Sequence, residues 1–247
     1  MIFRPFTLNE ARHILRLCRQ LINNALSGKE EEDITYILPQ ELREKLENTN
    51  YGVFVTIEKI ISSSMDGVYK RVVRGSVGAL PSDDYATLDL LKLVAPGAAT
   101  KDPRRTPLHK NELGSCVIEV MFVFPEGSVM TDDLHEILIP GYHVLAFDVD
   151  NCKRIIMPHE IIEIAENLLK DSDKSIGVDE LISAIVSKYE ISRRTLIQVY
   201  GSQIFYEVLP DSEIIERKLY LNRVFRRVVG KHRQLLAHAT SLSSKHR

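Results

Sequence analysis

The chain has 247 residues, of which 44% are hydrophobic and 27% are charged, and its formal net charge is −2. This composition is typical of a soluble globular protein that forms one large domain or two small ones. It excludes a bundle of membrane-spanning helices, because no apolar run approaches the roughly 20 residues that cross a bilayer.

The first element predicted along the chain is a helix that begins after Thr7. Thr7 and Glu10 have the spacing of a capping box, in which each residue satisfies a backbone donor of the other. Apolar residues then recur at steps of three and four positions, and Gly28 is expected to end the helix. A second helix is predicted for residues 39–48, with Pro39 near its first turn.

Two strands that form a hairpin are predicted next. Residues 51–61 and 68–73 are rich in β-branched and aromatic side chains, and the segment between them ends in an Asp-Gly pair. A helix is then expected to start at one of the capping residues in 81–84. Pro96 and Gly97 are predicted to interrupt that helix.

A strand buried on both faces is predicted for residues 116–124, where apolar residues surround Glu119. An isolated buried carboxylate is costly, so Glu119 is expected to be paired or to face a cleft. The other predicted elements are a turn at 125–127, strands at 143–149 and 152–157, helices at 158–169 and 178–189, and a strand at 195–208. Hairpins that alternate with helices indicate an α+β fold on a mainly antiparallel sheet flanked by helices.

The charge of the chain is unevenly distributed. Residues 213–247 contain nine Lys or Arg and two Glu, a net charge of +7, which leaves −9 for the remainder. An amphipathic helix is predicted for residues 212–238, and its basic side chains are candidates for contacts with nucleic-acid phosphates. These candidates are Arg223, Arg226, Arg227, Lys231 and Arg233. The alternatives are a solvated helix face or a segment that docks on the acidic body of its own chain.

The cysteines and histidines do not indicate a metal site. Cys18, Cys116 and Cys152 are widely spaced among apolar neighbours, so each is expected to be a small core residue with a reduced thiol. The histidines lack the spacing of a helical metal pair; those considered are His109, His135, His143 and His159. No signal peptide and no cofactor fingerprint is recognised, which predicts a cytoplasmic protein without metal or cofactor.

A short motif, Arg74-Gly75-Ser76-Val77-Gly78, follows the second strand of the predicted hairpin. Two glycines three positions apart mark a bend or a close approach of the backbone. Arg74 can present five donors to a carboxylate or phosphate, and Ser76 can act as a nucleophile where a base is near. The structural alternative is a tight strand end with Arg74 in a salt bridge.

Several blocks of the sequence, in order and spacing, resemble the AMMECR domain. The blocks are Gly52–Ile57, Arg74–Gly78, Ala98-Ala99 with Asp102-Pro103-Arg104, Glu112-Leu113, and Ile118–Val120, with weaker echoes at Gly141–Val144, Ile155–Pro158 and Tyr200–Glu207. The resemblance implies a fold with a larger and a smaller lobe and a groove between them. It predicts an AMMECR-like domain over residues 1–211, followed by a basic C-terminal helix and tail over residues 212–247.

The resemblance and the residue chemistry together indicate a candidate site. Its catalytic candidates are Ser76, Asp102 and Glu119, and its ligand-binding candidates are Arg74, Gly75, Gly78 and Arg104. An arginine would clamp an anion, a carboxylate would orient the arginine or act as a base, and the serine would bind or attack. The structural alternative is an ion network in which Asp102 pairs with Arg74.

Two departures from the family pattern affect the expected function. Ser76 stands where the family has cysteine, and Arg105 stands where a phenylalanine usually follows Asp-x-Arg. A serine hydroxyl is a much weaker nucleophile than a thiolate unless a base activates it. If the activity of the family needs a thiolate, this chain lacks it.

The leading prediction is a protein of unestablished activity, an enzyme or a ligand-binding protein, with a cleft for an anionic, nucleotide- or RNA-like ligand. The alternative is a non-catalytic adaptor or nucleic-acid-binding protein that acts through the basic C-terminal helix. Members of the family often accompany Memo-type and radical S-adenosylmethionine proteins, so the resemblance implies these as partners. No membrane partner is expected, and the sequence leaves open whether the protein is an enzyme.

Overall fold

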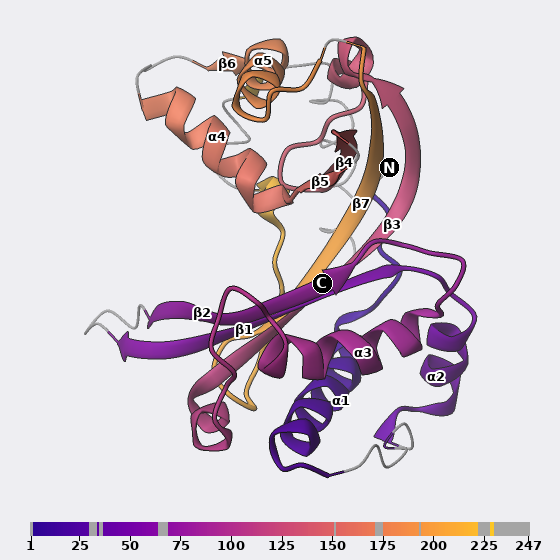
Figure 1. Cartoon of the computed structure of the whole chain (residues 1–247), viewed down its shortest axis with the longest axis vertical. Helices are drawn as coiled ribbons and strands as arrows, with labels where there is room; N and C mark the ends of the chain where they lie inside the picture. Colours follow the sequence, from indigo (N-terminus) through magenta and orange to yellow (C-terminus); the bar gives the residue numbers. More distant parts are fainter. Residues whose placement is uncertain are drawn as a thin grey trace, which may run out of the picture. The chain divides into compact units, whose positions relative to one another are not determined.

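A computed structural model describes residues 2–29, 34, 37–63, 69–150, 152–170, 175–192, 194–221 and 228–229. The chain divides into two compact units. The motif unit consists of Pro5–Phe124 and Gln203–Arg217. The insert unit consists of Pro125–Ser202 with the described parts of Met1–Arg4 and Lys218–Arg247. Each unit has its own hydrophobic core (Figure 1).

The first helix, α1 (Leu8–Leu26), confirms the predicted capping box. The Glu10 backbone amide donates to Thr7 Oγ1 over 3.2 Å, and the Thr7 amide donates to Glu10 Oε2 over 2.7 Å. Gly28 has a φ of +62° just after the helix, a value that favours glycine. The second helix, α2 (Gln40–Glu47), also follows the prediction.

The sheet of the motif unit has the strand order β2-β1-β3-β7, with β8 on the far side of β7. β1 pairs antiparallel with both β2 and β3, and β7 pairs antiparallel with β8. The strands are β1 (Gly52–Ser63), β2 (Tyr69–Ala79), β3 (Cys116–Met130), β7 (Leu196–Glu207) and β8 (Ile214–Glu216). The hairpin β1–β2 is confirmed, and so is the buried strand at 116–124, which forms the first part of β3.

Alternation along β1 divides its side chains between two faces of the sheet. Val53, Val55 and Ile57 are fully buried and belong to the same core cluster as the apolar sides of α1 and α3 (Thr87–Thr100). Figure 1 shows both helices beneath β1 and β2 within this unit. Thr56, on the other face, is only partly buried. Ser76 and Glu119, the candidates that pair in register with Thr56, therefore also face away from the helices.

The interruption predicted at Pro96 and Gly97 is wrong, because α3 continues through both residues to Thr100. A proline inside a helix removes one backbone hydrogen-bond donor and so destabilises the helix. In α3 this loss is offset, because the side of the helix that packs on the sheet is deeply buried. Ala95 and Ala98 are at most 1% exposed, so tertiary packing outweighs the local preference. The predicted caps at 81–84 are not used either, since α3 begins after Ala86 without a side-chain cap.

The insert unit contains a hairpin, two helices and short connecting elements. β4 (His143–Val149) pairs antiparallel with β5 (Cys152–Ile156) and with the first part of β7. Asp150, at the turn, has a φ of +50°. The other elements are α4 (Pro158–Lys170), α5 (Val178–Lys188), a 3-10 helix η3 (Thr131–Glu136) and a strand β6 (Ile176–Gly177) that pairs in parallel with β9 (Val228–Val229). The predicted hairpin, both helices and the late strand are confirmed.

Two further expectations need correction. The turn predicted at 125–127 is absent, because β3 continues to Met130; a proline at an exposed part of a strand has a φ that extended backbone tolerates. Cys152 is exposed, whereas Cys18 and Cys116 are buried as predicted. The apolar neighbours of Cys152 lie on a strand whose first residues face solvent.

The helix predicted for 212–238 is wrong wherever its residues are described. Ile214–Glu216 forms strand β8, Leu219–Leu221 forms a 3-10 helix η4, and Val228–Val229 forms β9. The backbone of β8 pairs with β7, where its β-branched residues fit a pleated surface. The five basic candidates for nucleic-acid contacts, Arg223, Arg226, Arg227, Lys231 and Arg233, lie outside the described residues. The predicted domain boundary at 212 stays a prediction.

The α+β class, with an antiparallel sheet flanked by helices, is confirmed. A search of the described helices for one long and apolar enough to cross a membrane finds none.

Candidate functional site

The Arg74–Gly78 motif lies inside β2 and forms a β-bulge. Ile57 of β1 pairs with Gly75, while the next residue, Glu58, pairs with Val73, so Arg74 is the extra residue on β2. A bulge re-aims a side chain without ending the strand. Of the two predicted alternatives, a bend or a close approach of the backbone, the bend does not occur: the strand continues to Ala79, and neither glycine of the motif has a positive φ.

The two glycines of the motif permit close packing. A Cβ on Gly75 would lie 1.8 Å from the carbonyl oxygen of Ala98, so α3 approaches the strand at this point. A Cβ on Gly78 would lie 2.1 Å from Phe54 Cδ1. Both positions therefore exclude any side chain for reasons of packing. Their predicted contact with a ligand stays a prediction.

Arg74 pairs with Glu112, from the 3-10 helix η2 (Lys110–Ser115), and not with Asp102. Arg74 Nη2 lies 3.1 Å from Glu112 Oε2, and Lys59 Nζ lies 2.8 Å from Oε1. Hydrogen bonds from Lys59, from the His109 backbone amide and from Arg74 lower the pKa of Glu112 to about 2. Two cations around one carboxylate make this cluster a structural ion network with one positive charge in excess.

Asp102 and Arg104 bind the outer edge of β2. The Ser76 backbone amide donates to Asp102 Oδ2 over 2.9 Å, and Arg104 Nη2 donates to the Ser76 carbonyl oxygen over 2.8 Å. β2 is the last strand in the described sheet order, so these two side chains take the place of a neighbouring strand. The loop that follows α3 thereby satisfies backbone groups that the sheet leaves open.

The Asp102–Arg104 pair is buried at one end and exposed at the other. Arg104 Nε and Nη2 lie 2.9 and 3.0 Å from Asp102 Oδ1 and Oδ2, a bidentate arrangement. The Asp102 side chain is 2% exposed, whereas that of Arg104 is 68% exposed. The hydrogen bonds from Arg104 hold the pKa of Asp102 well below its usual range.

Ser76 and Glu119 belong to a third group, on the sheet face that the helices leave uncovered. Thr56 pairs in register with Ser76 on one side and with Glu119 on the other. Thr56 Oγ1 and Ser76 Oγ are 2.9 Å apart. Glu119 Oε2 lies 3.0 Å from Arg217 Nη1 without hydrogen-bond geometry, and burial raises the pKa of Glu119.

The candidate residues therefore form three groups along β2, two of which meet at the backbone of Ser76. Arg74 belongs to the Glu112 network, Asp102 and Arg104 to the strand edge, and Ser76 with Glu119 to the row through Thr56. The hydrogen bond of Ser76 Oγ is to a hydroxyl, which is not the base that a serine nucleophile requires. Arg104 offers the clearest chemistry for an anion, since its guanidinium is oriented and exposed.

Two partners in these groups were not identified from the sequence. Glu112 stands three residues after His109 and accepts its backbone amide over 3.1 Å, a capping geometry that the spacing could have indicated. Thr56 has no signal of its own, because only the strand register places it between Ser76 and Glu119.

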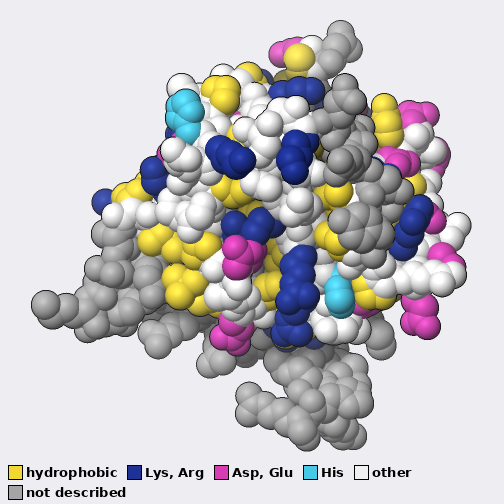
Figure 2. All heavy atoms as spheres, turned by 90° about the horizontal axis from the view of Figure 1, so that it is seen from below, with side chains coloured by type: hydrophobic (Ala, Val, Ile, Leu, Met, Phe, Trp, Pro, Cys, Tyr) yellow, Lys and Arg dark blue, Asp and Glu magenta, His cyan; other side chains and the backbone are white. Residues whose placement is uncertain are grey.

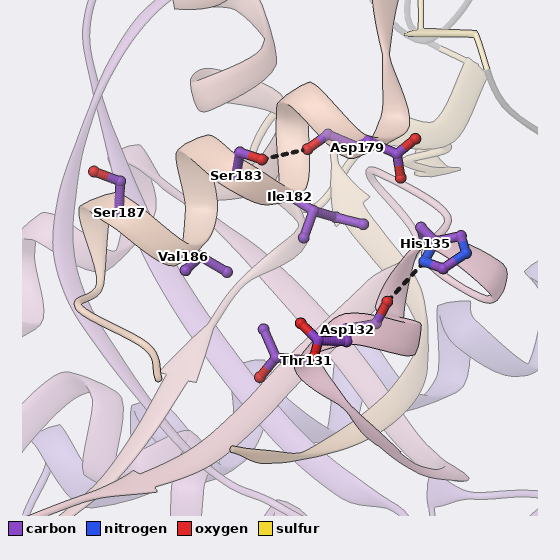
Figure 3. A pocket seen from close by; sticks show the side chains of 8 residues that line it. All are labelled: Thr131, Asp132, His135, Asp179, Ile182, Ser183, Val186 and Ser187. Atoms are coloured by element: carbon purple, nitrogen blue, oxygen red, sulfur yellow. Dashed lines mark hydrogen bonds between the residues drawn. The ribbon is translucent and has the colours of Figure 1, made fainter. Parts of the chain in front are cut away.

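The insert unit contains a polar hollow of about 400 Å³ that the sequence did not indicate (Figure 3). Residues of η3 and α5 line it, among them Asp132, His135 and Asp179. His135 Nδ1 lies 2.8 Å from the carbonyl oxygen of Asp132, so this nitrogen carries the proton. No group of three potential metal ligands occurs among the described residues.

A second polar network of the insert unit fixes the segment Gly141–Val144. The Ile139 amide donates to His143 Nδ1 over 3.0 Å, so Nε2 carries the proton and donates to Glu126 Oε2 over 2.9 Å. Tyr142 Oη donates to Glu126 Oε1 over 2.6 Å. Burial opposes charge on Glu126, but the hydrogen bonds from His143 and Tyr142 lower its pKa overall. The network fixes the backbone where β4 begins, and the His143 side chain is buried.

Comparisons with known proteins give one consistent result. A family model described as AMMECR1 matches residues 15–205. A protein of Pyrobaculum arsenaticum is 28% identical over 223 residues, covering 88% of this chain and 96% of its own length. Protein MJ0810 of Methanocaldococcus jannaschii is 26% identical over 219 residues, covering 87% and 99%.

A solved structure supports the fold. The uncharacterized protein PH0010 from Pyrococcus horikoshii is similar with a TM-score of 0.63 and 20% sequence identity, over 87% of this chain and 100% of that one. At this identity the likeness concerns the fold and not the activity.

Proposed function

This chain belongs to the AMMECR1 family, and from that premise we propose that its motif unit binds an anionic ligand at Arg104. The match over residues 15–205 confirms the family resemblance that the sequence indicated. The proposed ligand carries a phosphate or carboxylate group, with nucleotides and RNA as the first candidates.

The observation that carries this proposal is the geometry of the Arg104 guanidinium. Its Nε and Nη2 are held by Asp102 and by the Ser76 carbonyl, so the orientation of the planar group is fixed. No described residue accepts a hydrogen bond from Nη1. An exposed guanidinium whose Nη1 keeps two N–H donors, and which has little rotational freedom to lose, fits an anion.

The surroundings of Arg104 add positive charge. Lys101 and Arg105 are exposed on the same loop, and Asp102, the acidic residue between them, is already neutralised by Arg104. Figure 2 shows one face of the molecule on which Lys and Arg side chains lie in several separate groups, with acidic side chains beside some of them. The proposed site is thus a local basic loop and does not require a broad basic surface.

The proposal assigns binding and no reaction. Ser76 has a hydroxyl partner, so a role as nucleophile has no support from its hydrogen bond. Glu119, with a raised pKa, pairs with Arg217 on the uncovered face of the sheet. Partners of the Memo type and of the radical S-adenosylmethionine type, which the family resemblance implies, would present or consume the bound ligand.

Titration calorimetry of the full chain tests the site, with inorganic phosphate, ATP and a short single-stranded RNA as probes. Wild type is compared with Arg104→Gln and with the matched control Arg105→Gln. Loss of a charge-assisted hydrogen bond is expected to weaken binding by about tenfold or more in Arg104→Gln. The Arg105→Gln control is expected to change affinity by less than about fivefold.

Chemical denaturation of both variants distinguishes a lost contact from a lost fold. Arg104→Gln with wild-type unfolding and weaker binding supports the proposal. The proposal is wrong if Arg104→Gln, folded, binds all three probes as tightly as wild type does. It is also wrong if wild type binds none of them at low salt.

A further inference from the structure

A second hollow lies in the motif unit, between α1 and α3, and belongs to none of the groups on β2. It has a volume of about 360 Å³ and is lined by the C-terminal half of α1, by Ile34 and by the second half of α3. Small-molecule sites have volumes of a few hundred Å³ or more and are mostly apolar with a few polar groups. This hollow has that size and that composition.

The floor of the hollow is apolar. Leu21 and Ala25 of α1 and Leu93 and Pro96 of α3 line it. Leu93 is a large hydrophobic side chain that is 56% exposed, although the neighbouring Leu91 and Val94 are buried in the core. An exposed leucine beside an apolar hollow leaves hydrophobic surface in water that a ligand would cover.

The rim of the hollow is positively charged. Lys29, Lys92 and Lys101 all line it, and none of the three forms an ion pair with a described residue. Asp and Glu are absent from its described lining. Residues 30–33, which carry four carboxylates in the sequence, lie outside the described residues.

A polar donor is also present within the hollow. Asn24 is buried, lines the hollow and accepts a hydrogen bond from Gln20 Nε2 at its Oδ1 over 3.1 Å. Its amide nitrogen has no hydrogen-bond partner among the described residues. Asn24 Nδ2 is not one of the fully buried atoms without a partner, so it is open to solvent in the hollow, and a ligand acceptor would take the place of water there.

We propose that the hollow between α1 and α3 binds an amphipathic anion, an aliphatic chain that ends in a carboxylate or a phosphate. The chain would lie on Leu21, Ala25, Leu93 and Pro96, and the head group would contact the lysines and the Asn24 amide. The volume of the hollow, about 360 Å³, fits a single small molecule. This site does not include Arg104, although Lys101 belongs both to its rim and to the surroundings of Arg104.

The first test measures binding of octanoate, decanoate and dodecanoate to the full chain by calorimetry, below their micelle concentrations. Affinity is expected to rise by about fourfold for each added CH₂ that is buried. Decan-1-ol and decyltrimethylammonium are the head-group controls, and decyl phosphate distinguishes a phosphate from a carboxylate. Decanoate is expected to bind at least tenfold more tightly than decyltrimethylammonium, because the rim repels a cation.

Variants of the rim and of the floor locate the site. Each single change Lys29→Gln, Lys92→Gln or Lys101→Gln is expected to weaken decanoate binding by roughly two- to fivefold. Lys110→Gln, an exposed lysine of η2 that does not line the hollow, is the matched control and should bind as wild type does. Ala25→Met fills the floor and should weaken decanoate more than octanoate.

A decanoate analogue with a diazirine at its chain end adds a measurement that does not depend on any variant folding. Crosslinked peptides from α1 and α3 support the proposal. Crosslinks confined to other segments, or equal affinities for decanoate, decanol and the cationic control, overturn it. So does decanoate binding that the triple change of Lys29, Lys92 and Lys101 to Gln leaves unaltered.

Discussion

Two arginine–carboxylate pairs of the motif unit have the same chemistry in opposite surroundings. Arg19 pairs with Glu207, and their side chains are 12% and 4% exposed. Arg104 pairs with Asp102, and only the carboxylate is buried. Each carboxylate also accepts a strand amide over 2.9 Å, that of Ile118 for Glu207 and that of Ser76 for Asp102.

The difference lies in what each guanidinium does beyond the ion pair. Arg19 donates to the carbonyl oxygens of Leu113 and Cys116, so its donors are used inside the protein. Arg104 has donors left that face solvent. Burial raises the pKa of Glu207, whereas the hydrogen bonds from Arg104 lower that of Asp102. The Arg19–Glu207 pair is therefore a structural brace, that is, an ion pair whose donors are used within the protein. The Asp102–Arg104 pair satisfies backbone groups at the edge of β2 and also exposes a guanidinium to solvent.

The largest effect is expected from breaking the buried pair. Arg19→Met leaves Glu207 buried without its main cation and should lower the free energy of unfolding by about 3–5 kcal/mol. Urea denaturation at neutral pH measures the change, with Arg16→Met, an exposed arginine on the same helix, as the control. Adding Glu207→Leu to Arg19→Met should restore part of the loss. A double variant less stable than Arg19→Met would contradict the inference that Arg19 stabilises the fold by pairing with the buried Glu207 carboxylate.

A second large effect is expected at the contact of α3 with the bulged strand. Gly75→Ala places a methyl group 1.8 Å from the Ala98 carbonyl oxygen, and backbone on both sides cannot move easily. Overpacking of this kind should cost about 1–3 kcal/mol or more in unfolding free energy. Gly114→Ala is the control, since nothing lies within 4 Å of its added Cβ. Equal stability of the two variants would show that the helix is free to shift.

A moderate and pH-dependent effect is expected at Glu112. The pKa of Glu112 is lowered from 4.5 to about 2, so its carboxylate stabilises the folded state above pH 4.5 and loses this contribution as the pH falls toward 2. Glu112→Gln should cost about 1 kcal/mol at neutral pH, because a partly exposed pair is screened by solvent.

The difference between wild type and Glu112→Gln should then narrow as the pH is lowered from about 5 to about 3. Denaturation curves across that interval measure it, with the exposed Glu136→Gln as a control that should show a constant difference. A gap between wild type and Glu112→Gln that widens on acidification would mean that the ion network does not stabilise the fold.

The sequence predicted the elements well where local chemistry decides them. The Thr7–Glu10 capping box, the β1–β2 hairpin and the apolar strand around Glu119 are each predicted from a few neighbouring residues. The continuation of α3 through Pro96 and the strand β8 were missed, because packing and pairing with distant strands override local preference there.

The sequence identified residues of the candidate site, but it did not predict which of them contact one another. The sequence indicated Arg74, Ser76, Asp102 and Arg104, but a bulge and a register decide which of them meet. Alternation places Ser76 beside Thr56, and the extra residue in the bulge directs Arg74 toward Glu112. No spacing rule reports a register shift of one residue, which reverses the face of every side chain beyond it.

The smallest effect on stability is expected at the exposed Asp102–Arg104 pair. A small effect means that weaker anion binding by Arg104→Gln can be assigned to the lost contact and not to unfolding. Arg104→Gln loses an ion pair whose guanidinium is 68% exposed, so the free energy of unfolding should fall by less than about 1 kcal/mol. Asp102→Ala should cost more, since it also leaves the Ser76 amide without an acceptor. Denaturation of both variants measures the order. If Arg104→Gln proved as destabilising as Arg19→Met, the exposed pair would be a brace as well, and a loss of anion binding could no longer be assigned to a lost contact.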